Sequence, residues 1–300
     1  MTFTTLVAVL PLAVGGPEIK WNAPAVFVTG QPYTVHVEIA APKEGTVVAS
    51  WLLSPAAFTV DGQGLGKRED SGALSLPSGF KIQGDVDLSA HIPKGAAQFQ
   101  LGYASDLADT KALTVTLREG PPPSINFMDP IMTVEELASW HVLLLTNRGE
   151  IEVAMWPDVA PGHVRNFLDL AQVKFYDGTT FHRVMPGFMI QGGDPTGTGS
   201  GDGPRQCKAE FSPTKKHLKG VLSMARGGSP DSASCQFFIM HGTAPSLDGQ
   251  YSCFGEAVSG LDVVDRIAAA PGRPIPGVGG NKPNEPQVIE RAYVVKPLAK

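Results

Sequence analysis

Short runs of alternating hydrophobic and polar residues fill the chain from residue 17 to residue 119. Side chains alternate between the two faces of an extended strand, so each run predicts a strand with one apolar face. The runs span residues 31–40, 81–88, 97–103 and 112–117, and the first places four apolar side chains on one face, namely Tyr33, Val35, Val37 and Ile39. Strands at this spacing predict an antiparallel β-sandwich of the immunoglobulin-like kind over residues 17–119. We see no catalytic grouping there and expect a binding or positioning role.

Helical periodicity begins only after a proline-rich segment, residues 120–132, which we interpret as a semi-rigid linker because consecutive prolines favour an extended backbone. Thr133 can then cap a short helix. Apolar spacing predicts a helix over residues 161–172 and a second over residues 261–270, whose inward side chains would be Leu261, Val264, Ile267 and Ala268. Further strands are expected over residues 142–146, 151–156 and 288–295. Residues 133–300 therefore form a second domain.

Residues 181–194, FHRVMPGFMIQGGD, carry the most informative pattern of this domain. They predict two short strands joined by a Pro186-Gly187 turn, with Arg183 on one face of the first strand. Met189 and Gln191 share a face of the second strand and would lie opposite Arg183. A cation and a carboxamide beside an apolar surface suit a neutral, partly apolar substrate that forms hydrogen bonds. His182 points to the other face, and we expect it to be a packed structural residue.

Composition narrows the class of protein. Three hundred residues predict two domains, and a net charge of −5 argues against nucleic acid as a partner. No apolar run approaches the roughly 20 residues that span a bilayer. Residues 1–16 contain an apolar run, Leu6–Val14, that has the length of a signal segment, but no Lys or Arg precedes it. Export to the periplasm is one interpretation, and a buried first strand in a cytoplasmic protein is the other.

The three cysteines, Cys207, Cys235 and Cys253, form no CxxC pair and no zinc spacing, so we expect no metal. We place Cys235 and Cys253 in strands, as packed residues. Residues 197–203 are rich in glycine but lack the ending of a phosphate-binding loop, and we interpret them as a flexible loop. Residues 215–219 form a basic cluster that is too short to bind nucleic acid, and a solvated turn is expected.

Several long motifs occur in the order found in the cyclophilins, the family of peptidyl-prolyl cis-trans isomerases. They are FYDGTTFHRV at 175–184, the 181–194 motif, GVLSMAR at 220–226, SCQFFI at 234–239 and LDGQYSCFGEAVSGLDVVDRI at 247–267. The chain resembles this family from about residue 141 to about residue 271 and on to the last strand. The resemblance implies a closed eight-stranded antiparallel β-barrel capped by two helices. It also implies an isomerase of X-Pro bonds that assists protein folding without a cofactor and acts on unfolded or flexible X-Pro segments. We expect a monomer.

The resemblance also assigns roles to residues. It makes Arg183 the principal catalytic residue, with Gln191 beside it, and the alternative for Arg183 is a surface ion pair. Its substrate-binding positions are Phe188, Met189, Ala225, Arg226, Gln236, Phe238, Leu247 and Tyr251. Phe188, Met189, Phe238 and Leu247 would form the proline pocket, although each could instead be ordinary barrel core. Gln191 and Gln236 would bind the substrate or orient the arginine.

This sequence departs from the family pattern at three positions. Tyr251 stands where the family has an imidazole, and Arg226 stands where many eukaryotic members have asparagine. Ser246 replaces a tryptophan that the family links to tight cyclosporin binding, so weak inhibition by cyclosporin is expected. A competing interpretation is a scaffold protein whose barrel grips proline-containing segments while the N-terminal domain selects the partner. The presence of Arg183 and Gln191 favours the enzyme.

Overall fold

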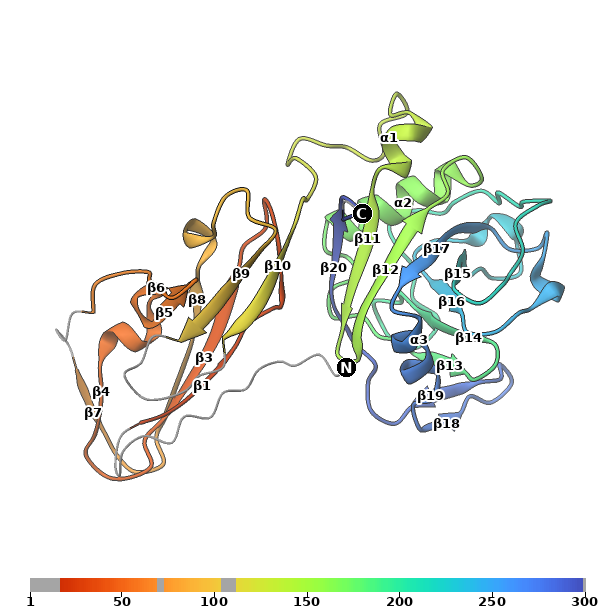
Figure 1. The fold of residues 1–300 in the computed structure, drawn as a ribbon. Helices are drawn as coiled ribbons and strands as arrows, with labels where there is room; N and C mark the ends of the chain where they lie inside the picture. Colours follow the sequence, from red (N-terminus) through yellow and green to blue (C-terminus); the bar gives the residue numbers. More distant parts are fainter. Residues whose placement is uncertain (1–16, 69–72, 104–111, 299–300) are drawn as a thin grey trace. The chain divides into compact units, whose positions relative to one another are not determined.

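The computed structural model describes residues 17–68, 73–103 and 112–298, and the chain divides between Gly120 and Pro121 into two units (Figure 1). The expected export segment, residues 1–16, lies outside the described residues. No helix within the described ranges is both long enough and apolar enough to cross a membrane. The protein is mainly β in both units.

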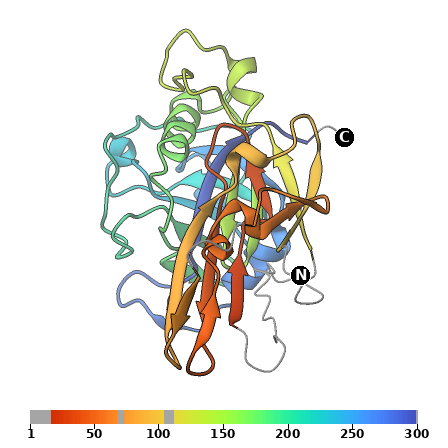
Figure 2. The same ribbon diagram turned by 90° about the vertical axis from the view of Figure 1, so that its left-hand side faces the viewer.

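The N-terminal unit contains short strands in three small sheets, and Figures 1 and 2 show them joined by turns. Sheet orders are β1-β3-β8, β2-β10-β9-β5-β6 and β4-β7. The face predicted from alternation is confirmed, because Tyr33, Val35, Val37 and Ile39 are all buried in one apolar cluster. The strands are β1 Glu18–Asn22, β2 Val26–Val28, β3 Thr34–Ala40, β4 Thr46–Val48, β5 Phe58–Val60, β6 Gln63–Gly64, β7 Leu74–Leu76, β8 Lys81–Asp87, β9 Gln98–Tyr103 and β10 Leu113–Arg118.

One strand pair of this unit differs from the expected antiparallel arrangement. β2 pairs with β10 in parallel, whereas β1, just before it in the chain, pairs with β3 in another sheet. Pro24 lies between β1 and β2, and proline has no N–H group with which to continue a strand ladder. The Pro24 carbonyl instead accepts a hydrogen bond from the Tyr33 hydroxyl at 2.7 Å. The chain therefore leaves the first sheet at Pro24 and joins the second.

The second unit is built on one ten-stranded sheet in the order β18-β19-β13-β14-β16-β15-β17-β12-β11-β20. The ladder is open where a closed sheet was expected. Between the start of β20 and the segment before β13, an isolated bridge joins Thr180 to Val288, and three backbone hydrogen bonds lie beside it without forming a strand ladder. The strands are β11 His141–Thr146, β12 Gly149–Met155, β13 Arg183–Met185, β14 Met189–Gly192, β15 Val221–Met224, β16 Phe237–Met240, β17 Cys253–Ser259, β18 Gly272–Pro274, β19 Asn281–Pro283 and β20 Ile289–Val295.

Three helices accompany this sheet: α1 Val134–Ala138, α2 Pro161–Gln172 and α3 Leu261–Ala268. α2 packs on β17 and β20, and α3 packs on β12, β13 and β14. Figure 1 draws α2 and α3 toward opposite ends of the sheet. The predicted bounds of α2 are confirmed. α3 ends two residues earlier than predicted, since the residue before Pro271 is disfavoured in a helix.

The inward face of α3 needs a correction at its first residue. Leu261 is 37% exposed, whereas Val263, Val264, Ile267 and Ala268 are buried. Leu261 is the first residue of the helix, directly after Gly260, whose φ of 83° lies in the left-handed region. It therefore lies at the end of the packed face, and Val263 takes its place in the core.

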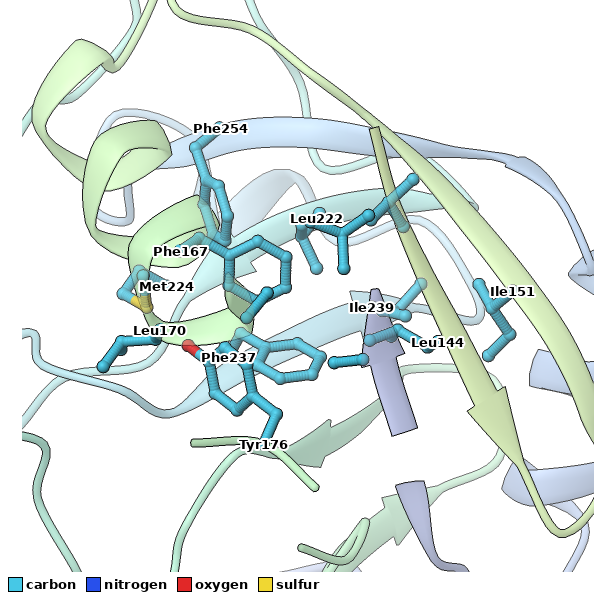
Figure 3. Close-up of a cluster of buried hydrophobic side chains, with 14 of the residues drawn as sticks. Leu144, Ile151, Phe167, Leu170, Tyr176, Leu222, Met224, Phe237, Ile239 and Phe254 are labelled. Carbon is cyan, nitrogen blue, oxygen red and sulfur yellow. The ribbon is translucent and has the colours of Figure 1, made fainter. Parts of the chain in front are cut away.

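A cluster of aromatic rings forms the core of the second unit (Figure 3). Phe167 of α2 lies with its ring centroid 5.1 Å from those of both Tyr176 and Phe237. The Phe254 ring, from β17, lies 5.2 Å from the Phe167 ring. The contacts with Phe237 and Phe254 are edge-on, and such contacts add about 0.5–1.5 kcal/mol each beyond the area buried. The helix is thereby fixed to the strands that carry the candidate site.

We predict that Thr133 stabilises α1 through a capping box. Its hydroxyl accepts the N–H of Glu136 at 3.1 Å, and its own N–H donates to the Glu136 carboxylate at 2.7 Å. Thr133→Ala should destabilise the helix by about 1 kcal/mol, which is about a five-fold change in local opening. Amide hydrogen exchange at Leu137, whose N–H donates to the Thr133 carbonyl, measures this opening. Thr133→Ser keeps the hydroxyl and is the control. Equal exchange in both variants would contradict the prediction.

Candidate functional site

The hairpin of β13 and β14 brings Arg183 and Gln191 together. The turn at Pro186-Gly187 closes with a hydrogen bond from the Phe188 N–H to the Met185 carbonyl at 2.9 Å. Gly187 has a φ of 79°, a value that glycine adopts without strain. The resulting register pairs Arg183 with Gln191. The predicted turn and facing are thus confirmed.

A chain of hydrogen bonds starts at the Arg183 guanidinium. Its Nη1 donates to Oε1 of Gln191 at 3.0 Å, and Nε2 of Gln191 donates to Oε1 of Gln236 at 3.0 Å. Nε2 of Gln236 then donates to the carbonyls of Gly199 and Gly201 at 3.1 and 2.9 Å. Each amide has its oxygen toward the arginine, so the chain has one consistent direction. Arg183 and Gln191 from the 181–194 motif and Gln236 from the 234–239 motif form one polar network.

An apolar cluster adjoins this network and contains the remaining predicted apolar residues. On β14 and β16, Gln191 pairs with Phe238 and Met189 pairs with Met240, so all four side chains share one face. Met189 and Phe238 are buried in this cluster. Four further predicted residues are half-buried against it: Phe188, Ala225, Leu247 and Tyr251. The structure therefore places an apolar surface directly beside a cation.

Arg226 lies at the edge of the cluster and contacts Tyr251. Its guanidinium carbon is 4.7 Å from the Tyr251 ring centroid, which is a cation–π distance. Its Nε donates to the Gln250 carbonyl at 3.1 Å. The Tyr251 ring in turn meets the Phe238 ring edge-on at 5.8 Å. Two of the three departures from the family pattern, Arg226 and Tyr251, therefore lie against the apolar cluster, while the third, Ser246, is exposed.

His217 is a residue of this region that the sequence did not indicate. It is 1% exposed and stacks on the Phe238 ring at a centroid distance of 6.0 Å. The Asp248 carboxylate accepts the His217 backbone N–H at 2.9 Å and faces the ring Nδ1 at 3.0 Å. On the other side, Nε2 lies 3.1 Å from the Ser223 hydroxyl and 3.4 Å from the Cys253 thiol. His217 therefore supports the back of the Phe238 ring.

The basic cluster at 215–219 is thus only partly the solvated turn that was expected. Its central histidine is buried, and Lys215 Nζ lies 3.8 Å from the centroid of the Trp156 ring. Lys216 and Lys219 form ion pairs with Asp248 and Asp265. The pattern of residues 215–219 did not predict that His217 is buried, because its apolar partner, Phe238, is distant in the sequence.

All three cysteines are buried and unpaired by disulfides. Burial raises the pKa of the Cys207 and Cys253 thiols to about 11, and that of Cys235 to about 12. Thiols in this state are weak nucleophiles. Cys253 lies in β17 as predicted, but Cys235 precedes β16 and is not in a strand. Within the described ranges, no three or more His, Cys, Asp or Glu side chains gather so as to hold a metal ion.

A hollow of about 250 Å³ adjoins Gln191, Gln236, Ala225 and Arg226. Its far wall is the glycine-rich loop that was expected to be flexible. The Asp194 carboxylate accepts the N–H groups of Thr196, Thr198 and Gly199, which orders this loop. Burial acts to raise the pKa of Asp194, but hydrogen bonds from Thr196 and the glycine N–H groups lower it to about 2. The carboxylate therefore stays ionised, and the loop is held.

A second hollow, of about 290 Å³, is lined by His182, Asp194 and Lys282 and by none of the predicted site residues. His182 is 5% exposed, as expected for a packed residue. Burial lowers its pKa below the ordinary value for histidine. Arg183, the next residue, is half-buried on the other face of the strand, and burial lowers the pKa of its guanidinium. Arginine keeps its charge across the ordinary pH range even so.

Arg183 has two further partners that sequence reasoning missed. Its Nε donates to the Gly279 carbonyl at 2.8 Å, and its Nη2 donates to the Val278 carbonyl at 3.2 Å. No side chain is involved at the accepting end, so the residue types at 278 and 279 did not identify them as partners of Arg183. The glycines at 277, 279 and 280 were the only indication that the backbone turns sharply there.

Comparisons with known proteins agree on one family. The family model described as cyclophilin type peptidyl-prolyl cis-trans isomerase/CLD matches residues 141–294. Peptidyl-prolyl cis-trans isomerase B of Bacillus subtilis is 48% identical over 128 residues, which cover 42% of this chain and 87% of the relative. Peptidyl-prolyl cis-trans isomerase A of Dickeya dadantii is 41% identical over 170 residues, which cover 53% and 86%.

One solved structure is a cyclophilin type peptidyl-prolyl cis-trans isomerase from Cryptosporidium parvum, determined in the presence of the dipeptide Ala-Pro. It is 31% identical, covers 52% of this chain and 99% of its own, and has a TM-score of 0.49.

We predict that acid destabilises the second unit through His217. Burial lowers the pKa of His217, although the Asp248 carboxylate acts in the opposite direction. The unfolded chain regains the ordinary pKa of about 6.5 and takes up a proton that the folded form resists. The contribution of His217 to the free energy of unfolding should therefore be fully present above about pH 6.5 and should decrease as the pH falls below that value. His182, whose pKa is also lowered by burial, contributes with the same sign.

Urea unfolding at several pH values between about 7 and 5, followed by NMR signals from residues after Pro121, measures this effect. His217→Gln should weaken the pH dependence. His36→Gln, at an exposed position of the N-terminal unit, is the control. A free energy of unfolding that stays constant or rises on acidification would contradict the assignment.

Proposed function

Because the chain belongs to the cyclophilin-type peptidyl-prolyl cis-trans isomerase family, and is a peptidyl-prolyl cis-trans isomerase, we propose that Arg183 is its catalytic residue. The observation that carries this proposal is the polar network of Arg183, Gln191 and Gln236, which lies against the apolar cluster around Phe238. The substrate is a polypeptide segment that contains proline.

The reaction is rotation about an X-Pro bond and breaks no covalent bond. Resonance gives the C–N bond partial double-bond character and a barrier of about 18–20 kcal/mol. Each reduction of about 1.4 kcal/mol speeds rotation ten-fold. The enzyme must therefore bind the twisted amide better than either planar form. A nucleophile is not required, which agrees with the raised pKa of all three thiols.

Arg183 supplies donors for the twisted amide. Twisting removes the resonance and returns the lone pair to the nitrogen, so the nitrogen becomes a better hydrogen-bond acceptor than it is in the planar forms. A guanidinium carries five N–H groups, and three of them are engaged by Gln191, Val278 and Gly279. Two N–H groups therefore remain for the substrate. Donors fixed in advance stabilise a transition state more than donors that must reorient.

The apolar cluster receives the proline ring in this proposal. Phe188, Met189, Phe238 and Leu247 provide a surface that has no hydrogen-bonding need of its own. Phe188 and Leu247 are half-buried and so remain accessible to a ligand, whereas Phe238 is held from behind by His217. When the proline ring is held, the carbonyl group of the residue before proline is the part that rotates about the C–N bond.

The other predicted residues bind the chain on either side of proline. Gln191 orients Arg183, and Gln236 orients Gln191. In each of the two amides the oxygen accepts a hydrogen bond from the preceding residue of the network and the nitrogen donates to the next. Ala225 and Arg226 line the adjoining hollow and can meet the peptide backbone. Tyr251 offers an aromatic face to the substrate, and the Arg226 cation rests on it.

The proposal also includes the closure of the sheet into a barrel and the fold class of the N-terminal unit. Eight of the ten strands, from β13 to β20 in the sheet order, would close into a barrel capped by α2 and α3. Support for closure comes from Thr180, which bridges Val288 across the open edge and Asp194 at the end of the β13–β14 hairpin. The N-terminal unit would be an immunoglobulin-like sandwich over residues 17–119, because two sheets share one apolar cluster. Residues 120–132 would be the linker to the isomerase domain, 133–300.

We propose that the enzyme works as a monomer without a cofactor, on X-Pro segments of unfolded or flexible clients. The N-terminal unit then binds or positions the client. Nucleic acid is an unsuitable partner for a chain with a net charge of −5.

Two substitutions test the role of Arg183. Arg183→Ala removes the charged donors and should lower kcat/KM about 100-fold or more, by analogy with the loss of a transition-state donor. Arg183→Lys keeps the charge but loses the planar arrangement of donors, so its kcat/KM should fall at least about ten-fold. Proline isomerisation of a peptide, followed by NMR exchange or a protease-coupled assay, measures both. Arg291→Ala, at an exposed arginine on β20, is the control. Wild-type activity in either Arg183 variant would refute the assignment.

Cyclosporin should inhibit this enzyme only weakly. Ser246 is exposed beside Leu247 and provides neither the area nor the donor of an indole. Catalysis should be less affected than cyclosporin binding, because Arg183 and the apolar cluster are present. Inhibition titrations in the same assay test this, and an inhibition constant in the low-nanomolar range would contradict it.

A further inference from the structure

The Arg183 guanidinium is held by backbone that follows it by almost one hundred residues. Nε donates to the Gly279 carbonyl at 2.8 Å and Nη2 donates to the Val278 carbonyl at 3.2 Å. Both carbonyls belong to the loop from Ile275 to Gly280, which we call the carbonyl loop. With Gln191 on Nη1, the arginine has a partner on each of its three nitrogens. One N–H on each terminal nitrogen is left over.

The carbonyl loop is attached to the same strand that carries Arg183. It connects β18 to β19, and these two strands pair from Gly272–Pro283 to Pro274–Asn281. Asn281, the first residue of β19, pairs with Val184 of β13. The loop also closes on itself, since the Ile275 N–H donates to the Gly280 carbonyl at 3.0 Å. The two carbonyls therefore have a fixed position relative to Arg183.

Two glycines of the loop share a backbone conformation but differ in their surroundings. Gly277 and Gly280 have φ values of 74° and 77°, in the region that disfavours other residues. A Cβ atom on Gly280 would lie 3.3 Å from Arg183 Nε and 3.1 Å from the Val184 carbonyl oxygen. A Cβ atom on Gly277 would meet nothing within 4 Å. Of these two glycines, only Gly280 lies where an added side chain would crowd Arg183.

All three partners of Arg183 are neutral oxygens, two from carbonyls and one from an amide. A carboxylate would orient the guanidinium as well but would neutralise its charge. Neutral acceptors fix the side chain and leave the positive charge for the substrate. Holding the fork in advance also removes rotamer entropy that a free arginine would lose each time it met the transition state.

We propose that the carbonyl loop is a positioning element of the active site, which holds Arg183 so that its two remaining N–H groups face the twisted amide. The inference rests on the proposed catalytic role of Arg183. It assigns a function to residues 275–280 that involves their backbone alone. Positioning of this kind should affect turnover more than binding, because the apolar cluster receives the proline ring independently.

A matched pair of variants tests the proposal. Gly280→Ala and Gly277→Ala introduce the same methyl group at the same kind of backbone conformation, but only the former displaces Arg183. Gly280→Ala should lower kcat about ten-fold and change KM less than about two-fold, beyond any effect of Gly277→Ala. Both constants are measured on an X-Pro peptide with the full chain. Equal losses in the two variants would show that backbone strain alone is responsible and would overturn the proposal.

A double variant separates the loop from the arginine. In an Arg183→Ala background, Gly280→Ala should cause no further loss, since the side chain that the loop positions is gone. An additional loss equal to that in the wild type would overturn the proposal. Full activity of Arg183→Ala itself would instead refute the proposed catalytic role. A large loss of activity in Arg183→Ala, together with equal losses in the two glycine variants, would refute the positioning role of the carbonyl loop. It would leave the catalytic role of Arg183 in place.

The wild-type protein provides a test that does not depend on the folding of any variant. The Nε–H of Arg183 should exchange with water more slowly than that of Arg273, an exposed arginine on β18. Nitrogen-15 NMR of the full chain measures both rates. Protection of at least about ten-fold is expected for a hydrogen bond held in the folded state. Equal exchange rates would show that the loop does not hold the guanidinium and would overturn the proposal.

Discussion

Alternation of side chains along β13, β14 and β16 determines both the core and the site of the second unit. On β16, Phe237 packs into the core against Phe167, whereas Phe238 belongs to the cluster beside the arginine. On β14, Ile190 is in the core, and Gln191 lies on the other face. A shift in register by one residue would exchange the two faces. The large apolar area buried by the core therefore also fixes the direction of the site side chains.

A charge beside an apolar surface is costly unless hydrogen bonds compensate it. Here burial lowers the pKa of Arg183, and three neutral oxygens offset the lost contact with water. The amides of Gln191 and Gln236 continue this compensation outward to main-chain carbonyls. Each donor in the series polarises the next, so the network acts as one unit. The positive charge remains available, because nothing in the series is an anion.

Much of this arrangement could be predicted from the sequence, because it follows from local rules. Alternation and the Pro186-Gly187 turn predicted that Arg183 faces Gln191, and Pro161 with the apolar spacing after it predicted α2. Contacts over long range could not be predicted in this way. The parallel pairing of β2 depends on where Pro24 releases the chain, and the burial of His217 depends on Phe238 and Asp248 from other segments.

The open strand order is a further example, because the pairing at the sheet edge consists of an isolated bridge at Thr180 with a few backbone hydrogen bonds beside it, rather than a strand-length ladder. A run of alternating residues predicts that a strand exists and which face it buries. It does not specify the partner of an edge strand, since that choice depends on the twist and curvature of the whole sheet. Family resemblance supplied an expectation for closure that the local pattern could not.

Main-chain carbonyls anchor both ends of the polar network, and they come from the two most glycine-rich loops of the unit. Gly199 and Gly201 accept from Gln236, and residues 278 and 279 accept from Arg183. Glycine-rich segments read as flexible in a sequence, because glycine loses the most conformational entropy on folding. Here the Asp194 carboxylate orders one loop, and the bond from Ile275 to Gly280 closes the other. The glycines permit backbone shapes that turn carbonyl oxygens toward side chains, so these loops are ordered parts of the site.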